Sequence, residues 1–86
     1  MYRNQTVLVT GASRGIGKDL CLYFLKNGAK VIGVSRSAST IEEGAYHHVQ
    51  TDITQEKPVR ELFRGIRISH GAVDILINNA GVLTSQ

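Results

Sequence analysis

The chain has 86 residues and a mass of 9.4 kDa, which limits it to one small domain. Hydrophobic residues make up 42% of it and charged residues 20%, a composition typical of a globular protein and too apolar for a disordered chain. The net charge is +3, and the longest apolar run, residues 20–25, is far too short to span a bilayer, so we expect a cytoplasmic protein without membrane contacts.

The first two predicted elements are a buried strand and an amphipathic helix. Residues 6–10 form a short β-branched run, typical of a strand that is covered on both faces in a parallel sheet. A helical period then runs from Ile16 to the stop signal Asn27-Gly28. The face expected to be buried carries Ile16, Leu20, Tyr23 and Phe24. Cys21 is interpreted as a small packing residue. Because it is the single cysteine, an intrachain disulfide and a multi-cysteine metal site are excluded.

The remaining elements continue the alternation of strand and helix. We expect strands at residues 30–34 and 46–50, joined by a polar link with at most a helical turn at residues 41–43. Thr54 can cap a second helix that ends at His70-Gly71, and residues 75–77 form a fourth strand. The apolar stripe of the second helix consists of Val59, Leu62, Phe63 and Ile66. This order predicts an α/β protein, the first half of a doubly wound parallel sheet with right-handed crossovers.

A glycine-rich loop, residues 11–17, joins the first strand to the first helix. Gly11 provides the sharp turn, Gly15 would let the backbone approach a ligand, and Gly17 would let the helix pack tightly on the strand. The N–H groups at the helix start favour an anion such as pyrophosphate. The spacing G-x-x-x-G-x-G differs from the commoner G-x-G-x-x-G and from a P-loop. In this context we favour nucleotide binding over a plain structural turn.

Three segments resemble the short-chain dehydrogenase/reductases. They are Thr10-Gly11-Ala12-Ser13-Arg14-Gly15-Ile16-Gly17, Asp52-Ile53 and Asn78-Asn79-Ala80-Gly81. The resemblance runs through the whole chain but corresponds only to the cofactor half of a typical member. It implies a Rossmann-type sheet with the strand order 3-2-1-4, one partial NADP-binding domain over residues 1–86, and an oxidoreductase whose full-length form is a homo-oligomer.

The resemblance also implies roles for individual residues. The glycine-rich loop, with Ser13 and the backbone of Ile16, would cradle the pyrophosphate. Asp52 would accept a hydrogen bond from the adenine amino group, with Ile53 packing beside the ring, and Asn78 would brace the central strands. The residues expected along the adenosine ribose are Asn79, Ala80 and Gly81. The structural alternatives are a helix-terminal charge or turn at Asp52 and a simple strand stop at Asn78-Asn79.

The end of the second strand favours NADP(H) over NAD(H). An NAD site needs a carboxylate there for the ribose hydroxyls, whereas this chain has Ser35-Arg36-Ser37 and no acidic residue before Glu42. A guanidinium binds a 2′-phosphate through paired hydrogen bonds, and Arg14 in the glycine-rich loop would add a second positive charge. The alternative is that Arg36 is a solvated loop residue.

No catalytic residue is assigned. The resemblance implies a tyrosine followed four residues later by a lysine, and the tyrosines here are followed at that distance by threonine, asparagine and glutamine. The pairs are Tyr2 and Thr6, Tyr23 and Asn27, and Tyr46 and Gln50. We therefore expect the chain alone to be inactive, and a small carbonyl or alcohol substrate would need the catalytic half.

Two other functions remain open, namely a non-catalytic nucleotide-binding remnant and a basic interaction module. The basic stripe on the second helix consists of Lys57, Arg60, Arg64 and Arg67. Glu56 and Glu61 are spaced to pair with Arg60 and Arg64, so an ion-paired solvated helix is favoured over a nucleic-acid surface. His47-His48 lie on a strand, where neighbours face opposite sides, so they are not expected to hold a metal together.

Overall fold

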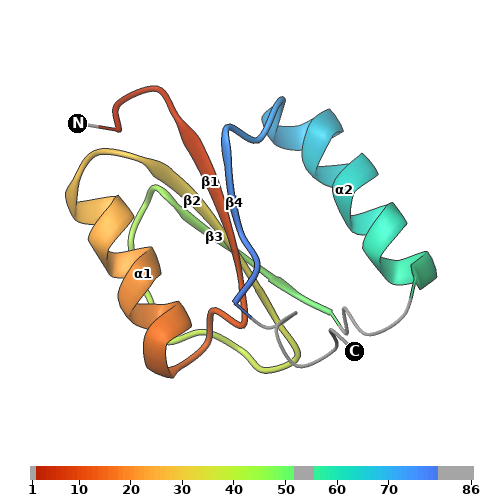
Figure 1. Cartoon of the computed structure of the whole chain (residues 1–86), viewed down its shortest axis with the longest axis horizontal. Helices are drawn as coiled ribbons and strands as arrows, with labels where there is room; N and C mark the ends of the chain where they lie inside the picture. Colours follow the sequence, from red (N-terminus) through yellow and green to blue (C-terminus); the bar gives the residue numbers. More distant parts are fainter. Residues whose placement is uncertain (1, 52–55, 80–86) are drawn as a thin grey trace.

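Strands and helices alternate along the chain in a computed structural model that describes residues 2–51 and 56–79, apart from the side chains of residues 56–59 (Figure 1). The elements are β1 (Thr6–Thr10), α1 (Gly15–Lys26), β2 (Lys30–Ser35), β3 (Tyr46–Gln50), α2 (Glu56–His70) and β4 (Ile75–Ile77). The predicted elements are thus confirmed, and the link before β3, for which at most one helical turn was expected, contains none at residues 41–43. Predictions for Asp52, Ile53, Thr54, Ala80 and Gly81 lie outside the described residues.

The strands form one parallel sheet in the order β3-β2-β1-β4, as predicted. β1 lies between β2 and β4, where Val7 is paired with Val31 on one side and Ile75 on the other. All five residues of β1 are buried, which explains why no charged residue interrupts its apolar centre, Val7-Leu8-Val9. In Figure 1, α1 and α2 lie on opposite faces of the sheet, as a doubly wound fold requires.

Alternating side chains of the strands build one core on each face. Val7 and Val9 of β1 pack in a cluster with Cys21 and Phe24 of α1. Leu8 packs with the buried Ile66 of α2 in a second cluster, joined by these residues of β2 and α2: Ile32, Val34, Leu62 and Phe63. The described part of the predicted stripe on α2 therefore does face the sheet.

The buried face of α1 agrees with the prediction at Phe24, which is buried, and at Leu20, which packs against the core, but differs at the other two positions. Ile16 is 71% exposed and Tyr23 50% exposed, whereas the buried residues of α1 are Gly17, Cys21 and Phe24. Gly17 and Cys21 each follow a residue of the predicted face by one position. The helix is therefore rotated about its axis from the expected orientation. Gly17 sets this rotation because it lets the helix approach the backbone of the glycine-rich loop closely.

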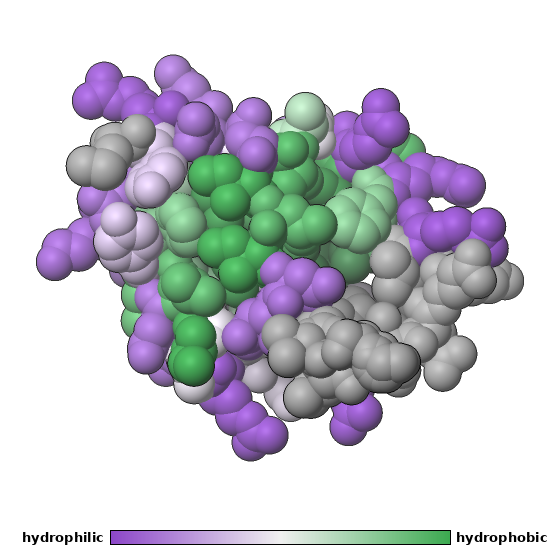
Figure 2. Space-filling model, viewed as in Figure 1, coloured by the Kyte–Doolittle hydropathy of each residue, from purple (hydrophilic) through white to green (hydrophobic). Residues whose placement is uncertain are grey.

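The surface separates apolar from polar regions. Figure 2 shows apolar side chains gathered in the middle of the face on which β4 lies in Figure 1, between polar margins. Leu76 of β4 is 53% exposed. Neither α1 nor the described part of α2 is long and apolar enough to cross a membrane.

Candidate nucleotide-binding site

The glycine-rich loop contains two backbone conformations that favour glycine. Gly11 has a φ of 66° and Gly15 a φ of 62°, both in the left-handed region. The N–H groups of Gly11 and Ala12 donate to the carbonyl of Val34, at 2.8 and 3.2 Å. These bonds tie the start of the loop to the end of β2, so two neighbouring strand ends meet at one edge of the sheet.

Gly17 provides the close approach between α1 and the loop. A Cβ at this position would overlap the carbonyl oxygen of Gly11 and lie 2.9 Å from the side-chain nitrogen of Asn79. The first turn of the helix is therefore in contact with the backbone at the end of β1. Any larger residue would push the helix away from the strand.

The N-terminus of α1 is suited to an anion. Arg14 precedes the helix with an extended backbone, its side chain makes no capping hydrogen bond, and the first turn contains no acidic residue. A Cβ at Gly15 would meet no atom within 4 Å, so the space beside this N-terminus is open among the described residues. Uncapped first-turn N–H groups and the helix dipole together attract negative charge.

The end of β4 contributes two asparagines to the same edge. The hydroxyl of Thr10 donates to Asn78 Oδ1 at 3.2 Å, which links β1 to the residue after β4. Asn79 Nδ2 donates to the carbonyl of Gly11 at 3.3 Å. Residues that are 68 positions apart in the sequence are thus brought together beside the glycine-rich loop.

The end of β2 carries a buried serine followed by an exposed arginine. Ser35 is buried, and its hydroxyl donates to the carbonyl of Ser37 at 2.6 Å. Arg36 is exposed, as is Arg14 in the glycine-rich loop, and Ser13 is half-buried. The residues placed at this edge of the sheet are therefore the glycine-rich loop, Ser35, Arg36 and the asparagine pair.

Side chains of β3 hold the segment after β2, a role that was not predicted from the sequence. His48 Nε2 lies 2.8 Å from the carbonyl of Ser37, and Gln50 Nε2 donates to the carbonyl of Arg36 at 2.9 Å. The hydroxyl of Tyr46 lies 2.7 Å from His48 Nδ1. The signal in the sequence was the two-residue spacing of Tyr46, His48 and Gln50, which puts all three on one face of a strand.

The neighbouring histidine points elsewhere. His47 makes an edge contact with His70 of α2, with ring centroids 4.7 Å apart, so His47 and His48 face opposite sides of the sheet as expected. The described residues contain no group of three or more histidine, cysteine or acidic side chains that could hold a metal ion.

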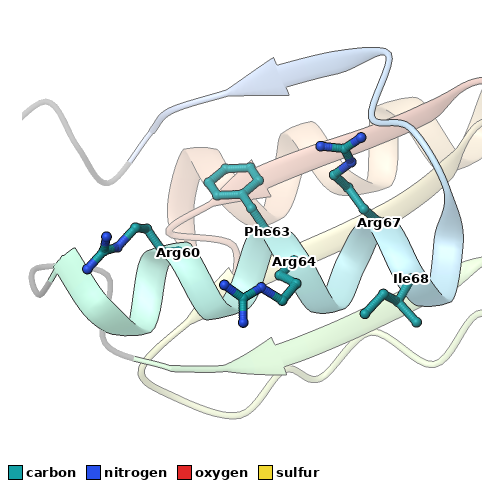
Figure 3. Close-up of a pocket in the computed structure, with 5 residues that line it drawn as sticks. All are labelled: Arg60, Phe63, Arg64, Arg67 and Ile68. Atoms are coloured by element: carbon teal, nitrogen blue, oxygen red, sulfur yellow. The ribbon is translucent and has the colours of Figure 1, made fainter.

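A second feature of the surface is a groove on α2. It has a volume of about 660 Å³ and is lined by Arg60, Phe63, Arg64, Arg67 and Ile68 (Figure 3). Among the described residues, Arg64 forms no ion pair with Glu61, contrary to the expected ion-paired helix; the side chain of Glu56 lies outside the described residues. The groove shares no residue with the glycine-rich loop.

The fold and its glycine-rich loop define a Rossmann-type α/β protein. The family model for short chain dehydrogenases matches residues 5–86, so the chain belongs to this family. It is 36% identical to human dehydrogenase/reductase SDR family member 11, over 94% of this chain and 35% of the relative. It is 37% identical to the short-chain dehydrogenase/reductase homolog YusS of Bacillus subtilis, over 92% of this chain and 82% of the relative.

A solved structure of the same family is also similar. A short chain dehydrogenase from Leptospira borgpetersenii with bound NAD+ superimposes with a TM-score of 0.83 at 30% identity, covering 90% of this chain and 31% of that one. The chain thus spans about a third of the length of this protein and of the human relative.

Proposed function

We propose that the chain binds NADP(H), in preference to NAD(H), as the cofactor half of an oxidoreductase. The hydride would move between the cofactor and a carbonyl or alcohol substrate. The observation that carries this proposal is the uncapped N-terminus of α1 beside a strand end that presents Arg36 and no carboxylate. Membership of the short chain dehydrogenase family and the NAD+ bound to the Leptospira relative support the dinucleotide class.

The described residues fit the phosphate groups of such a cofactor. The pyrophosphate would lie against the first-turn N–H groups of α1, where Gly15 leaves open space. The exposed guanidinium of Arg36, with that of Arg14, would bind the 2′-phosphate of NADP. Asn79 would border the adenosine ribose, and the same proposal includes Asp52, Ile53, Ala80 and Gly81 for the adenine and ribose. When bound, the nicotinamide ring supplies the hydride chemistry.

The chain alone is proposed to bind the cofactor without turning it over. None of its tyrosines is followed four residues later by a lysine, and Tyr46 is buried in the core. Oxidation of NADPH by the chain in the presence of an aldehyde or ketone would contradict this part of the proposal.

The test is a comparison of the dissociation constants of NADPH and NADH. We expect NADPH to bind about tenfold to a hundredfold more tightly, because charge-assisted hydrogen bonds to the 2′-phosphate contribute about 1.5–3 kcal/mol. Arg36→Asp should reverse this preference, since a carboxylate repels the phosphate and accepts hydrogen bonds from ribose hydroxyls. Titration of nicotinamide fluorescence measures both constants.

The matched control is Arg67→Asp, which makes the same change at an exposed position on α2. It should leave both dissociation constants within about twofold, because Arg67 lies outside the candidate site. Equal affinity of the unmodified chain for NADH and NADPH would refute the NADP(H) preference, and absence of binding to both would refute the dinucleotide site.

The groove on α2 favours a second candidate function, a basic surface for an acidic partner. Three arginines line it beside Phe63 and Ile68. This function requires no dinucleotide, so the same titration separates the two candidates.

A further inference from the structure

We propose that His48 is the positioning residue for 2′-phosphate recognition, because it holds the Arg36-Ser37 segment in the conformation that presents Arg36. Tyr46 and Gln50 support it from the same face of β3. The inference rests on the proposed NADP(H) binding and deepens it, since it assigns a specificity role to a strand that carries none of the expected phosphate ligands.

The register of the sheet brings these side chains to the segment. β3 pairs in parallel with β2, so that His48 is opposite Gly33 and Gln50 is opposite Ser35. The chain leaves β2 at Ser35 and passes beside the face that carries His48 and Gln50. Two consecutive carbonyls, those of residues 36 and 37, are therefore within hydrogen-bond reach of β3.

Hydrogen-bond chemistry determines which ring nitrogen of His48 carries the proton. The carbonyl of Ser37, 2.8 Å from Nε2, can only accept, so Nε2 is the donor. In the neutral ring Nδ1 is then an acceptor, and the hydroxyl of Tyr46 donates to it at 2.7 Å. Nε2 also lies 3.0 Å from the hydroxyl of Ser35. Both sides of the ring are thus engaged, which fixes its tautomer and orientation.

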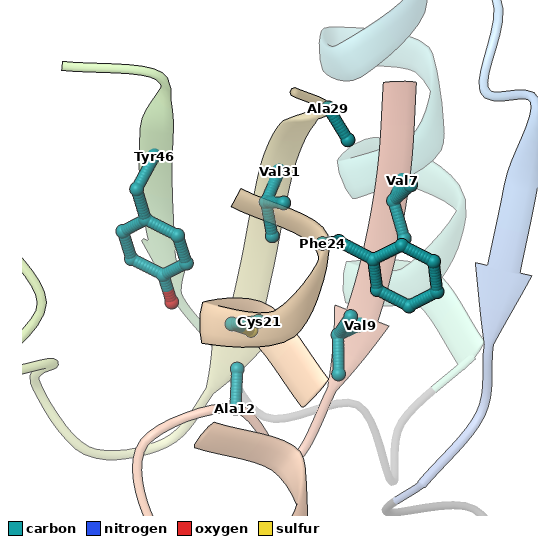
Figure 4. Close-up of a cluster of buried hydrophobic side chains, with 8 residues drawn as sticks. All are labelled: Val7, Val9, Ala12, Cys21, Phe24, Ala29, Val31 and Tyr46. Carbon is teal, nitrogen blue, oxygen red and sulfur yellow. The ribbon is translucent and has the colours of Figure 1, made fainter. Parts of the chain in front are cut away.

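Tyr46 is itself held rigidly. A Cβ at Gly33 would overlap the Tyr46 hydroxyl and lie 2.8 Å from the Cβ of Ala12, so the glycine provides the space for this hydroxyl next to the glycine-rich loop. The rings of Tyr46 and His48 stack, with centroids 5.8 Å apart and planes inclined by 28°. Figure 4 shows the Tyr46 hydroxyl directed toward Cys21 and Ala12. His48 therefore rests on a packed support.

This support matters for Arg36 because its own side chain is exposed and has no ion-pair partner among the described residues. Its position depends on the backbone, where its carbonyl is bound by Gln50 and the next carbonyl by His48 and Ser35. A fixed backbone lowers the entropy lost when the guanidinium binds an anion. Loss of the His48 hydrogen bond should thus weaken binding of the 2′-phosphate and leave binding of the pyrophosphate unchanged.

The first test measures discrimination between NADPH and NADH in three variants of the full chain. His48→Leu should lower the ratio of the two affinities about threefold to tenfold while changing NADH affinity less than twofold. His48→Gln should restore most of the ratio, because its amide N–H can take the place of Nε2–H. His47→Leu is the matched control on the opposite face and should leave the ratio unchanged.

The second test needs no cofactor. Trypsin cleaves after Arg36 only when this segment leaves the surface of β3, so the rate of that cleavage reports how well the segment is held. We expect cleavage between Arg36 and Ser37 to be several-fold faster in His48→Leu and unchanged in His47→Leu and His48→Gln. Mass spectrometry of the early fragments measures it.

The outcomes separate the inference from the proposed function. An unchanged cleavage rate in His48→Leu overturns the inference, as does an unchanged affinity ratio or an equal loss of affinity for both dinucleotides. If the unmodified chain binds neither dinucleotide, the proposed function fails with the specificity role. The cleavage rates then still decide whether His48 holds the segment.

Discussion

Two buried side chains, Cys21 and Tyr46, keep their protons to unusually high pH. Burial raises the pKa of the Cys21 thiol from its usual 9.0 to about 11 and that of the Tyr46 hydroxyl from 10.0 to about 12. Cys21 is fully buried in the core under α1, as expected for a packing residue, and a thiol held neutral is a poor nucleophile.

These shifts predict a loss of stability in alkaline solution. Between pH 9 and 11 the unfolded chain releases protons that the folded chain retains, so the free energy of unfolding falls as pH rises. We expect a fall of about 1 kcal/mol over this range, since solvent screens part of the effect. Urea midpoints at pH 8 and 10.5 measure it.

Cys21→Ala is the control for the alkaline loss. It lowers stability at neutral pH through a small cavity, and it should also flatten the decline above pH 9 because one of the two groups is removed. A urea midpoint of the unmodified chain that is constant up to pH 10.5 would contradict the prediction.

At the residue scale, the roles of the glycines in the glycine-rich loop were predictable from the sequence, whereas the hydrogen bonds from β3 to the segment after β2 were not. Gly11 and Gly15 have the backbone conformations that the motif requires, since only glycine adopts them without strain. For His48 the sequence predicts only that it does not hold a metal together with His47, since its hydrogen bonds depend on where the segment after β2 runs. That path is set by tertiary packing rather than by local pattern.

At the element scale, α1 shows that the spacing of apolar residues is not sufficient to predict which face of a helix is buried. Counting apolar residues favoured a buried face with Ile16 and Tyr23, yet both are exposed. The close contact of Gly17 with Gly11 decides which side of the helix meets the sheet. A glycine contributes nothing to an apolar count, although here it determines how the helix docks.

Gly17→Ala tests this contact. The added Cβ would overlap the carbonyl oxygen of Gly11, so α1 must move away from β1. We expect a loss of about 1–3 kcal/mol of stability, typical of overpacking, together with at least tenfold weaker dinucleotide binding. Urea unfolding and the fluorescence titration measure the two effects.

Gly65→Ala makes the same substitution in the middle of α2, where a Cβ would meet nothing within 4 Å. It should stabilise the chain by about 0.5–1 kcal/mol, because alanine favours the helix over glycine. If Gly17→Ala behaved like this control, the contact between α1 and the loop would not determine the docking of the helix.

At the scale of the whole molecule, the alternation of strands and helices made a parallel, doubly wound sheet predictable, whereas the strand order came from the resemblance to the short-chain dehydrogenase/reductases. The predicted order leaves β4 bonded to β1 on one side, and no described strand lies on its other side. Leu76 is half-exposed there, and Figure 2 shows apolar surface in this region. Unpaired backbone groups and apolar side chains on an edge strand promote association between chains.

We therefore expect the 86-residue chain by itself to be unstable or to associate as its concentration rises. Leu76→Lys should reduce this association severalfold, because a charged side chain on an edge strand disfavours pairing with a second chain. Leu22→Lys is the matched control, since Leu22 is 40% exposed on α1, away from the edge. Sedimentation velocity over a range of concentrations measures association. A monomer at every concentration, with a sharp and reversible thermal transition, would show that the edge of β4 is tolerated in solution.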